Sequence, residues 1–269
     1  SGTGGTAGTG GTGGVGGADA QAVSIAFVAK VGDADFECGT TYDLGSADTP
    51  LELADFRFYV EGIELQNDAD EWVAVSLDDT NFQTDDVALL DFEDGCGELG
   101  NADLNEVVTG TVPVGTYSAV RFNMGVPFEM NHENPAVAPP PMNLTSMHWN
   151  WQGGYKFLRV DAAGFSSGGW RTHLGSTGCD GDPISGGTTE CTTPNVVNVE
   201  LDGFDPGTNA VVADLAALVA GQDLDNIAPM PPGCMSGPTD PDCTSIFANL
   251  GLPFEGVPAP GPQTFFRMQ

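Results

Sequence analysis

The chain of 269 residues is long enough for one large domain or two small ones, and its hydrophobic fraction of 40% can bury a sizeable core. The chain has 38 acidic against 7 basic residues and a formal net charge of −31. This charge balance argues against binding to nucleic acid or to an anionic membrane surface, because both need cationic side chains. No apolar run reaches the roughly 18 residues of a membrane span, so no transmembrane segment is predicted.

The first 17 residues, SGTGGTAGTGGTGGVGG, carry glycine at every third position. One interpretation is a flexible tether to the cell surface, since glycine-rich segments behave as random coils. The alternative is an extended helix with three residues per turn, in which glycine lets neighbouring backbones approach closely. This alternative predicts that residues 1–17 join copies of the chain into a homo-oligomer.

From residue 22 onward, the sequence has the alternating, β-branched pattern of strands, as in AVSIAFVAKVG and LELADFRFYVEGIELQ. The segment 211–221, VVADLAALVAG, fits either a strand running into one helical turn or a short helix. Residues 222–269 are rich in proline and glycine and are expected to wrap the body as ordered loops. We therefore predict an all-β protein. Residues 22–269 form a single antiparallel β-sandwich or barrel-like domain with long disulfide-stapled loops, preceded by a low-complexity arm over 1–21.

Six cysteines occur at wide spacing and none forms a C-x-x-C motif, which disfavours a zinc ribbon or a thioredoxin-like site. An even number is typical of disulfides in an oxidising compartment. Spacing favours the local pairs Cys179–Cys191 and Cys234–Cys243, which leaves Cys38 with Cys96. Six cysteines allow about fifteen connectivities, so other pairings stay open.

Enzyme motifs are absent from the sequence: it has no G-x-S-x-G elbow, P-loop, H-E-x-x-H or dinucleotide fingerprint. We therefore expect a binding protein and not an enzyme.

The acid pairs Asp85/Asp86 and Asp240/Asp242 are interpreted as solvated loop charges, with a weak calcium site as the minority alternative.

The three histidines each neighbour a soft or aromatic residue: Met130 precedes His132 closely, Met147 adjoins His148, and Trp170 precedes His173. Imidazole combined with a thioether suits Cu(I) better than it suits a hard cation. If residues 145–152 are extended, Met147, Trp149 and Trp151 share one face, and His148 lies on the other. On that assumption His148 is a bystander, and two tryptophans on one face are otherwise explained by core packing.

Several longer segments resemble a known family: LADFRFYVEGIEL, VALLDFEDGCG, GTYSAVRFNMGVPFEMNHENPA, MNLTSMHWNWQGGYKFLRVD and THLGSTGC. They are similar to the MbnP family of copper-binding proteins, also described as the four-Cys half of a metallo-mystery pair. The resemblance implies a β-rich, disulfide-bonded bacterial protein of the periplasm, the outer-membrane surface or the extracellular space. It also implies Cu(I) held by histidines and by a kynurenine, which a MauG-like dihaem c-type cytochrome peroxidase makes by oxidising a tryptophan.

Carried over by position, the resemblance implies His132 and His173 as copper ligands and Trp151 or Trp149 as the oxidised residue. Trp151 is preferred, although nothing excludes Trp149, and Met147 or Met130 could supply a further soft ligand. The expected role is copper acquisition or storage. Two alternatives remain: a structural subunit that polymerises through its glycine-rich arm, and a glycan-binding sandwich with an exposed tryptophan.

Overall fold

The computed structural model describes residues 19–84, 87–96, 100–150, 152–164, 169–182, 184–225 and 232–269. The expected assembly joint at residues 1–17 lies outside the described residues, as do Trp151 and the acid pair Asp85/Asp86.

Strands dominate the described residues, and the few helices are short, so the expected all-β class is confirmed. The helical elements are α1 (Phe128–Asn131), η1 (Thr145–Met147), α2 (Leu215–Leu218) and α3 (Cys243–Asn249). The strands are β1 (Ala20–Val31), β2 (Ala34–Asp35), β3 (Thr41–Leu44), β4 (Thr49–Asn67), β5 (Trp72–Ala74), β6 (Ser76–Leu77), β7 (Val87–Asp91), β8 (Val107–Pro113), β9 (Tyr117–Met124), β10 (His148–Asn150), β11 (Gly154–Tyr155), β12 (Leu158–Gly164), β13 (Trp170–Leu174), β14 (Thr177–Cys179), β15 (Cys191–Thr193), β16 (Val197–Asp202), β17 (Ala210–Asp214), β18 (Gly233–Cys234) and β19 (Phe266–Met268).

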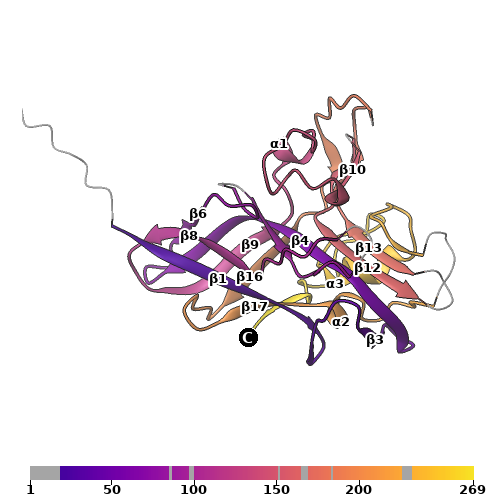
Figure 1. Cartoon of the computed structure of the whole chain (residues 1–269), viewed down its shortest axis with the longest axis horizontal. Coiled ribbons are helices and arrows are strands. Elements are labelled where there is room, and N and C mark those ends of the chain that lie inside the picture. The colour runs from indigo at the N-terminus through magenta and orange to yellow at the C-terminus, as the bar shows by residue number, and fades with distance from the viewer. Residues whose placement is uncertain are drawn as a thin grey trace, which may run out of the picture.

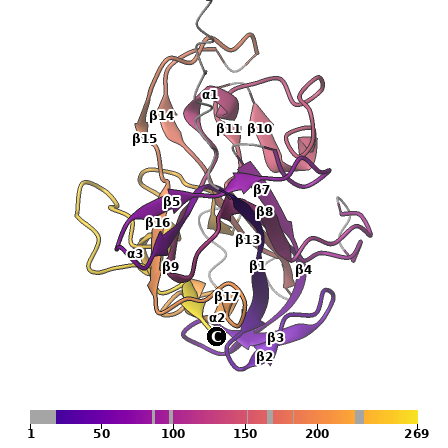
Figure 2. The same ribbon diagram turned by 90° about the vertical axis from the view of Figure 1, so that its left-hand side faces the viewer.

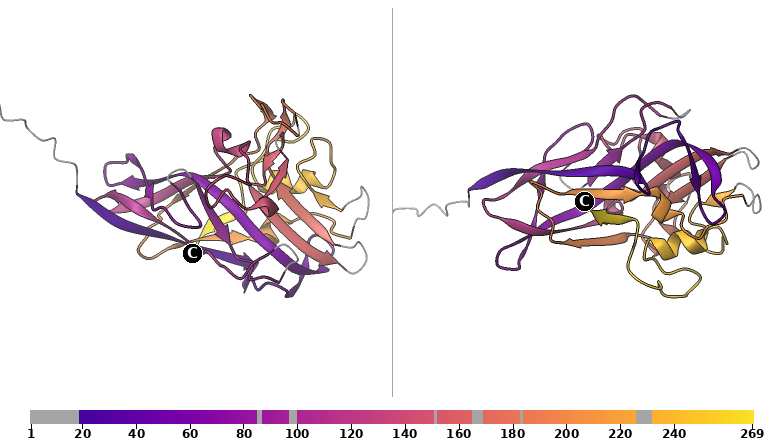
Figure 3. Two further views of the ribbon diagram at one scale, coloured as in Figure 1. Left: turned by 45° about the horizontal axis from the view of Figure 1, so that its top comes forward. Right: turned by 90° about the horizontal axis from the view of Figure 1, so that it is seen from below.

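Two sheets enclose the main core (Figures 1 and 3). The first has the order β19-β17-β1-β8-β6, and the second has the order β16-β9-β4-β12-β13-β18. Most pairs are antiparallel as expected, but β1 pairs with β17 and β13 with β18 in parallel. The two parallel pairs could not be read from the sequence, because an alternating pattern reports which face is buried and not the direction of the partner strand.

Strand β4 is buried on both faces, and this double burial positions the site. Phe56 and Phe58 face the main core, where they pack against Phe92 and Phe265. The next residue along the strand, Tyr59, faces the opposite side and belongs to a second, smaller hydrophobic core. That second core consists of Tyr59, Val87, Leu89, Val126, Met142, Met147, Tyr155 and Phe157. The second sheet therefore has a further layer packed on its outer face.

The further layer is the chain excursion 126–157, between β9 and β12, together with the hairpin β14–β15; we call it the site lobe. Figure 2 shows α1, β10, β11, β14 and β15 gathered at one end of the molecule. The excursion is long and has little regular secondary structure. Its shape therefore depends on anchors to the sheet beneath it.

The disulfides join Cys38 to Cys96, Cys179 to Cys191 and Cys234 to Cys243, which are the pairs that the spacing favours. Segment 211–221 is a strand that runs into one helical turn, since the carboxylate of Asp214 accepts from the backbone N–H groups of Ala216 and Ala217. The C-terminal region is more regular than expected. It contains α3 and also β19, which pairs with β17 and brings Phe265 and Phe266 into the core.

Candidate metal centre

Buried tyrosines anchor the site lobe to the sheet. The Tyr59 hydroxyl donates to the carbonyl oxygen of Pro141 at 3.1 Å, and the Tyr155 hydroxyl donates to that of Met142. Both rings are fully buried and meet edge to face. Burial raises the pKa of each phenol above its usual value, so both stay protonated and keep donating. The lobe is therefore held in one position over the second core.

The stretch 145–152 is not one extended strand, as the face argument assumed. Residues 145–147 form the 3-10 turn η1, and only His148–Asn150 are strand. The carbonyl oxygen of Ser146, inside this turn, accepts from Lys156 Nζ at 2.7 Å and from Arg159 Nη1 at 3.0 Å. Because these cations hold the turn, the alternation of faces starts only at His148. It still sets His148 and Trp149 on opposite faces, but it no longer assigns Met147 to the face of the indoles.

His148 is half-buried, and its ring packs edge to face on Tyr155 with centroids 4.9 Å apart. Its Nε2 atom is buried without a hydrogen-bond partner. Burial lowers the pKa of His148 to about 4, with contributions from the charges of His132 and Lys156. At neutral pH the ring is therefore an uncharged imidazole.

His132 follows α1 and lies near enough to affect the titration of His148. Its Nε2 atom lies 3.2 Å from the Asn131 side-chain nitrogen and 3.5 Å from Cys191 Sγ. The orientation of the Asn131 amide is settled by Tyr155, whose backbone N–H donates to Asn131 Oδ1 at 2.8 Å. Asn131 Nδ2 must then donate to His132, so Nε2 carries the lone pair and Nδ1 the proton.

These two rings fit a metal ion of soft or borderline character. Neutral imidazole nitrogens are common ligands for copper and zinc. A buried ring nitrogen without a partner, as in His148, costs stability unless something occupies its lone pair. In His132 the same lone pair is occupied by the Asn131 amide, which a bound metal would replace. The donor set is thus one imidazole from each of two loops of the site lobe.

His173 lies in a buried ion-pair network instead. It is 6% exposed on β13, and its Nε2 atom lies 2.7 Å from Asp161 Oδ1. Asp161 also accepts from Arg159, which in turn pairs with Asp55 at 3.1 Å. The groups that influence the pKa of His173 are Asp161, Lys156 and Arg159, whereas His132 influences that of His148. Of the other two imidazoles, His148 is therefore the one whose titration is coupled to His132.

The two methionines have packing roles. Met147 is fully buried in the second core, and Met130 is partly buried against the same core. Methionine fills irregular gaps of this kind because its side chain is flexible and polarisable. Neither placement depends on a metal.

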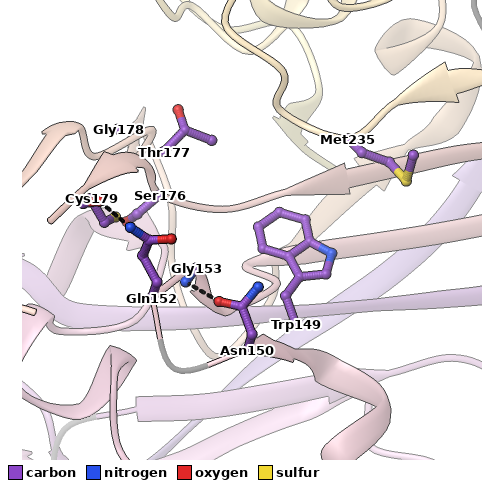
Figure 4. A pocket seen from close by; sticks show the side chains of 9 residues that line it. All are labelled: Trp149, Asn150, Gln152, Gly153, Ser176, Thr177, Gly178, Cys179 and Met235. Atoms are coloured by element: carbon purple, nitrogen blue, oxygen red, sulfur yellow. Dashed lines mark hydrogen bonds between the residues drawn. The ribbon is translucent and has the colours of Figure 1, made fainter. Parts of the chain in front are cut away.

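Trp149 lines a pocket of about 390 Å³ with Asn150, Gln152, Gly153, Ser176, Thr177, Gly178, Cys179 and Met235 (Figure 4). The indole is half-buried and lies on the Met235 side of this pocket (Figure 4). Its ring packs over the backbone at Gly175, where an added Cβ would lie 2.5 Å from Trp149 Cζ3. Of the two candidate tryptophans, Trp149 is thus reachable from a cavity, and Trp151 lies outside the described residues.

A calcium site finds no support. Asp240 Oδ1 accepts from the backbone of Asp242, and Asp242 Oδ2 accepts from the backbone of Gly233. Within the part of the chain that the structure describes, the groups of three or more donors close enough to hold an ion are His132/Cys179/Cys191 and Cys38/Asp94/Cys96. Neither includes Asp240 or Asp242.

Sequence reasoning discounted His148, although it lies in the most aromatic stretch of the chain. The available signal was the turn-forming Asn-Leu-Thr-Ser segment just before it, which favours a turn over a straight strand from residue 145.

No helix among the described residues is long and apolar enough to cross a membrane.

Comparisons with known proteins agree with one another. The MbnP family model matches residues 20–236. The solved structure of MbnP from Methylosinus trichosporium superimposes with a TM-score of 0.82 at 30% sequence identity, covering 93% of this chain and 98% of the other. No curated protein matches the sequence.

Proposed function

The chain belongs to the MbnP family, and on this basis we propose that it is a copper-binding protein in which His132 and His148 hold Cu(I). The observation that carries the proposal is the buried, unpartnered Nε2 atom of His148, whose titration is coupled to His132. Soft d10 cations such as Cu(I) accept neutral nitrogen donors without charge compensation from carboxylates. The proposed pair of ligands has His148 in place of His173, because Nε2 of His173 is already hydrogen-bonded to the Asp161 carboxylate.

The finer proposal is that a tryptophan of the W-x-W pair is oxidised to kynurenine and completes the site. Kynurenine offers an aryl amine and a ketone, two donors that indole lacks. Trp149 supports the proposal by its position, half-buried and open to a pocket whose wall includes Cys179, the disulfide partner of Cys191 next to His132. Trp151 remains the alternative, and a MauG-like dihaem peroxidase is the proposed oxidant.

The proposed location is the periplasm, the outer-membrane surface or the extracellular space. The three disulfides support an oxidising compartment. The proposed role is acquisition or storage of copper by a binding protein without enzymatic activity. The net charge of −31 favours accumulation of cations near such a protein.

The test is competition for Cu(I) against a chromophoric chelator under anaerobic conditions. His132→Ala and His148→Ala should each weaken Cu(I) binding at least tenfold. His173→Gln, which can still donate a hydrogen bond to Asp161, should bind like the parent. The proposal fails if the His148→Ala variant retains full affinity, and His173 returns as a ligand if its Gln variant loses it.

The kynurenine proposal has its own measurement. Conversion of tryptophan to kynurenine exchanges one carbon for one oxygen and raises the peptide mass by about 4 Da. Fragmentation of the peptide that contains Trp149 and Trp151 would locate the change. An unchanged mass in protein isolated from its native source would remove the kynurenine and its oxidising partner, while the two-histidine site would stand.

A further inference from the structure

The Cys179–Cys191 disulfide lies directly against a proposed copper ligand. The two cysteines face each other across the hairpin β14–β15, where they are register partners. His132 Nε2, the nitrogen with the lone pair, lies 3.5 Å from Cys191 Sγ. One donor atom from each of the three side chains falls within 4.8 Å of the others.

We propose that this disulfide masks a second metal-binding state: when it is reduced, the Cys179 and Cys191 thiolates and His132 form a soft-metal site. The inference shares His132 with the copper site and rests on that proposed function for the identity of the metal, Cu(I). The disulfide is then a redox control on the metal centre. In the oxidised protein, His132 serves the imidazole site, and in the reduced protein it joins two stronger sulfur donors.

The existing geometry is close to that of a ligand set. In a tetrahedral site with metal–nitrogen and metal–sulfur bonds of about 2.0 and 2.3 Å, a nitrogen and a sulfur ligand lie about 3.5 Å apart. The distance of 3.5 Å between His132 Nε2 and Cys191 Sγ already matches this separation. The two sulfurs must move apart once their bond is broken, and rotation about χ1 provides this movement without a change in the hairpin.

Access distinguishes this disulfide from the one at the C-terminal end. Cys179 and Cys191 are half-buried, and Cys179 lines the pocket beside Trp149. Cys234 and Cys243 are only 1% and 0% exposed. Since thiol–disulfide exchange requires direct attack on sulfur, a small dithiol can reach the first pair much more readily than the second.

The chemistry balances with a dithiol as the reductant. The dithiol gives two electrons to the Cys179–Cys191 bond and becomes a disulfide, and the two cysteines become thiols. Each thiol then loses one proton to solvent when it binds the metal as thiolate. The metal itself changes no oxidation state in this step.

The experiment uses Cd²⁺ as the probe, because cadmium thiolates absorb in the ultraviolet where imidazole complexes do not. The partly exposed Cys38–Cys96 pair is removed by the variant Cys38→Ser/Cys96→Ser, which is treated with dithiothreitol and desalted anaerobically. We expect one Cd²⁺ per chain with a thiolate absorption band. Adding Cys179→Ser/Cys191→Ser should abolish the band, and adding His132→Ala should weaken Cd²⁺ binding at least tenfold.

Wild-type protein provides a second measurement that does not depend on the folding of the double-serine background. Differential alkylation and peptide mapping identify which cysteines open, and bound Cd²⁺ should protect Cys179 and Cys191 from alkylation. The inference is overturned if the pair stays closed in the folded protein, if the opened thiols give no band, or if His132→Ala leaves affinity unchanged.

Cu(I) binding by the oxidised protein, measured in parallel, separates the two proposals. Loss of the cadmium band with intact Cu(I) binding overturns the redox inference alone. Absence of Cu(I) binding in the oxidised form, together with a cadmium band after reduction, overturns the two-histidine copper site alone.

Discussion

Burial of its ring and the nearby charge of His132 lower the pKa of His148 to about 4. The two residues come from different parts of the excursion over the second sheet. One follows the short helix α1, and the other begins strand β10. Their proximity depends on the packing of the excursion on the second core, and each prediction below tests one part of that arrangement.

Replacing Gly175 by alanine should displace Trp149. The new Cβ would lie 2.5 Å from Trp149 Cζ3 and 2.7 Å from the carbonyl oxygen of Tyr155, both closer than packing allows. We expect a loss of about 1–3 kcal/mol in unfolding free energy together with a shift in tryptophan fluorescence. Gly153→Ala is the matched control, since its Cβ would lie at an ordinary 3.4 Å from the same indole. Equal behaviour of the two variants in urea unfolding would contradict the packing of Trp149 over Gly175.

Replacing Asn131 by aspartate should reverse the tautomer of His132. A carboxylate accepts hydrogen bonds but cannot donate one, so His132 Nε2 would have to carry the proton. The adjacent negative charge would also raise the pKa of His132. We expect at least tenfold weaker Cu(I) binding at neutral pH and a change in the imidazole nitrogen chemical shifts.

Asn131→Ala provides the comparison for that experiment. It leaves the Nε2 lone pair of His132 free but removes the acceptor for the buried N–H of Tyr155, at a cost of about 1–3 kcal/mol in stability. Its Cu(I) affinity should stay nearer to that of the parent. If both variants lose copper equally, the tautomer is not what determines binding.

Asp91 should make the protein less stable as the pH rises toward neutrality. Its side chain is fully buried, and burial raises its pKa to about 7, with the neighbouring Arg57 opposing this shift. In the unfolded chain the pKa is about 3.9, so the folded state binds more protons between about pH 4 and pH 7. The stabilisation is complete below the unfolded pKa and is lost as the pH rises through the folded one.

Asp91→Asn should remove this contribution. We expect its stability relative to the parent to increase by up to a few kcal/mol between about pH 4 and pH 8 in urea titrations. The titration of His148 acts in the opposite direction over part of this range, and the comparison of the two proteins cancels it. A pH-independent difference would mean that Asp91 is ionised in the fold.

Asp161 should contribute stability that is lost in acid. Burial alone would raise its pKa, but the hydrogen bonds and charges of His173 and Arg159 outweigh that effect and hold the pKa well below its usual value. The contribution is therefore complete above the unfolded pKa of about 4 and declines as the pH falls below it.

Asp161→Asn should thus destabilise the protein on the order of 3 kcal/mol at neutral pH, because it leaves His173 without its carboxylate and Arg159 with Asp55 alone. The difference from the parent should shrink in urea titrations as the pH falls below about 4. A constant difference across that range would contradict the depressed pKa.

The candidate site was only partly accessible from the sequence. The aromatic stretch around His148 and the histidine of NHENP were recognisable as unusual, and the family resemblance pointed to a metal. The choice of His173 as the second ligand relied on its position in a motif. The tertiary structure shows that its ring is hydrogen-bonded to Asp161, a residue of the neighbouring strand β12.

The sequence by itself determined the β class, the local disulfides and the burial of the phenylalanine-rich strands, because alternation and spacing are properties of the chain alone. It could not determine which imidazole lies near His132. That depended on the turn at residues 145–147, which is held by Lys156 and Arg159 from beyond the turn, and on the hairpin that carries Cys191. Such contacts join residues distant in sequence, and only the packed structure brings them together.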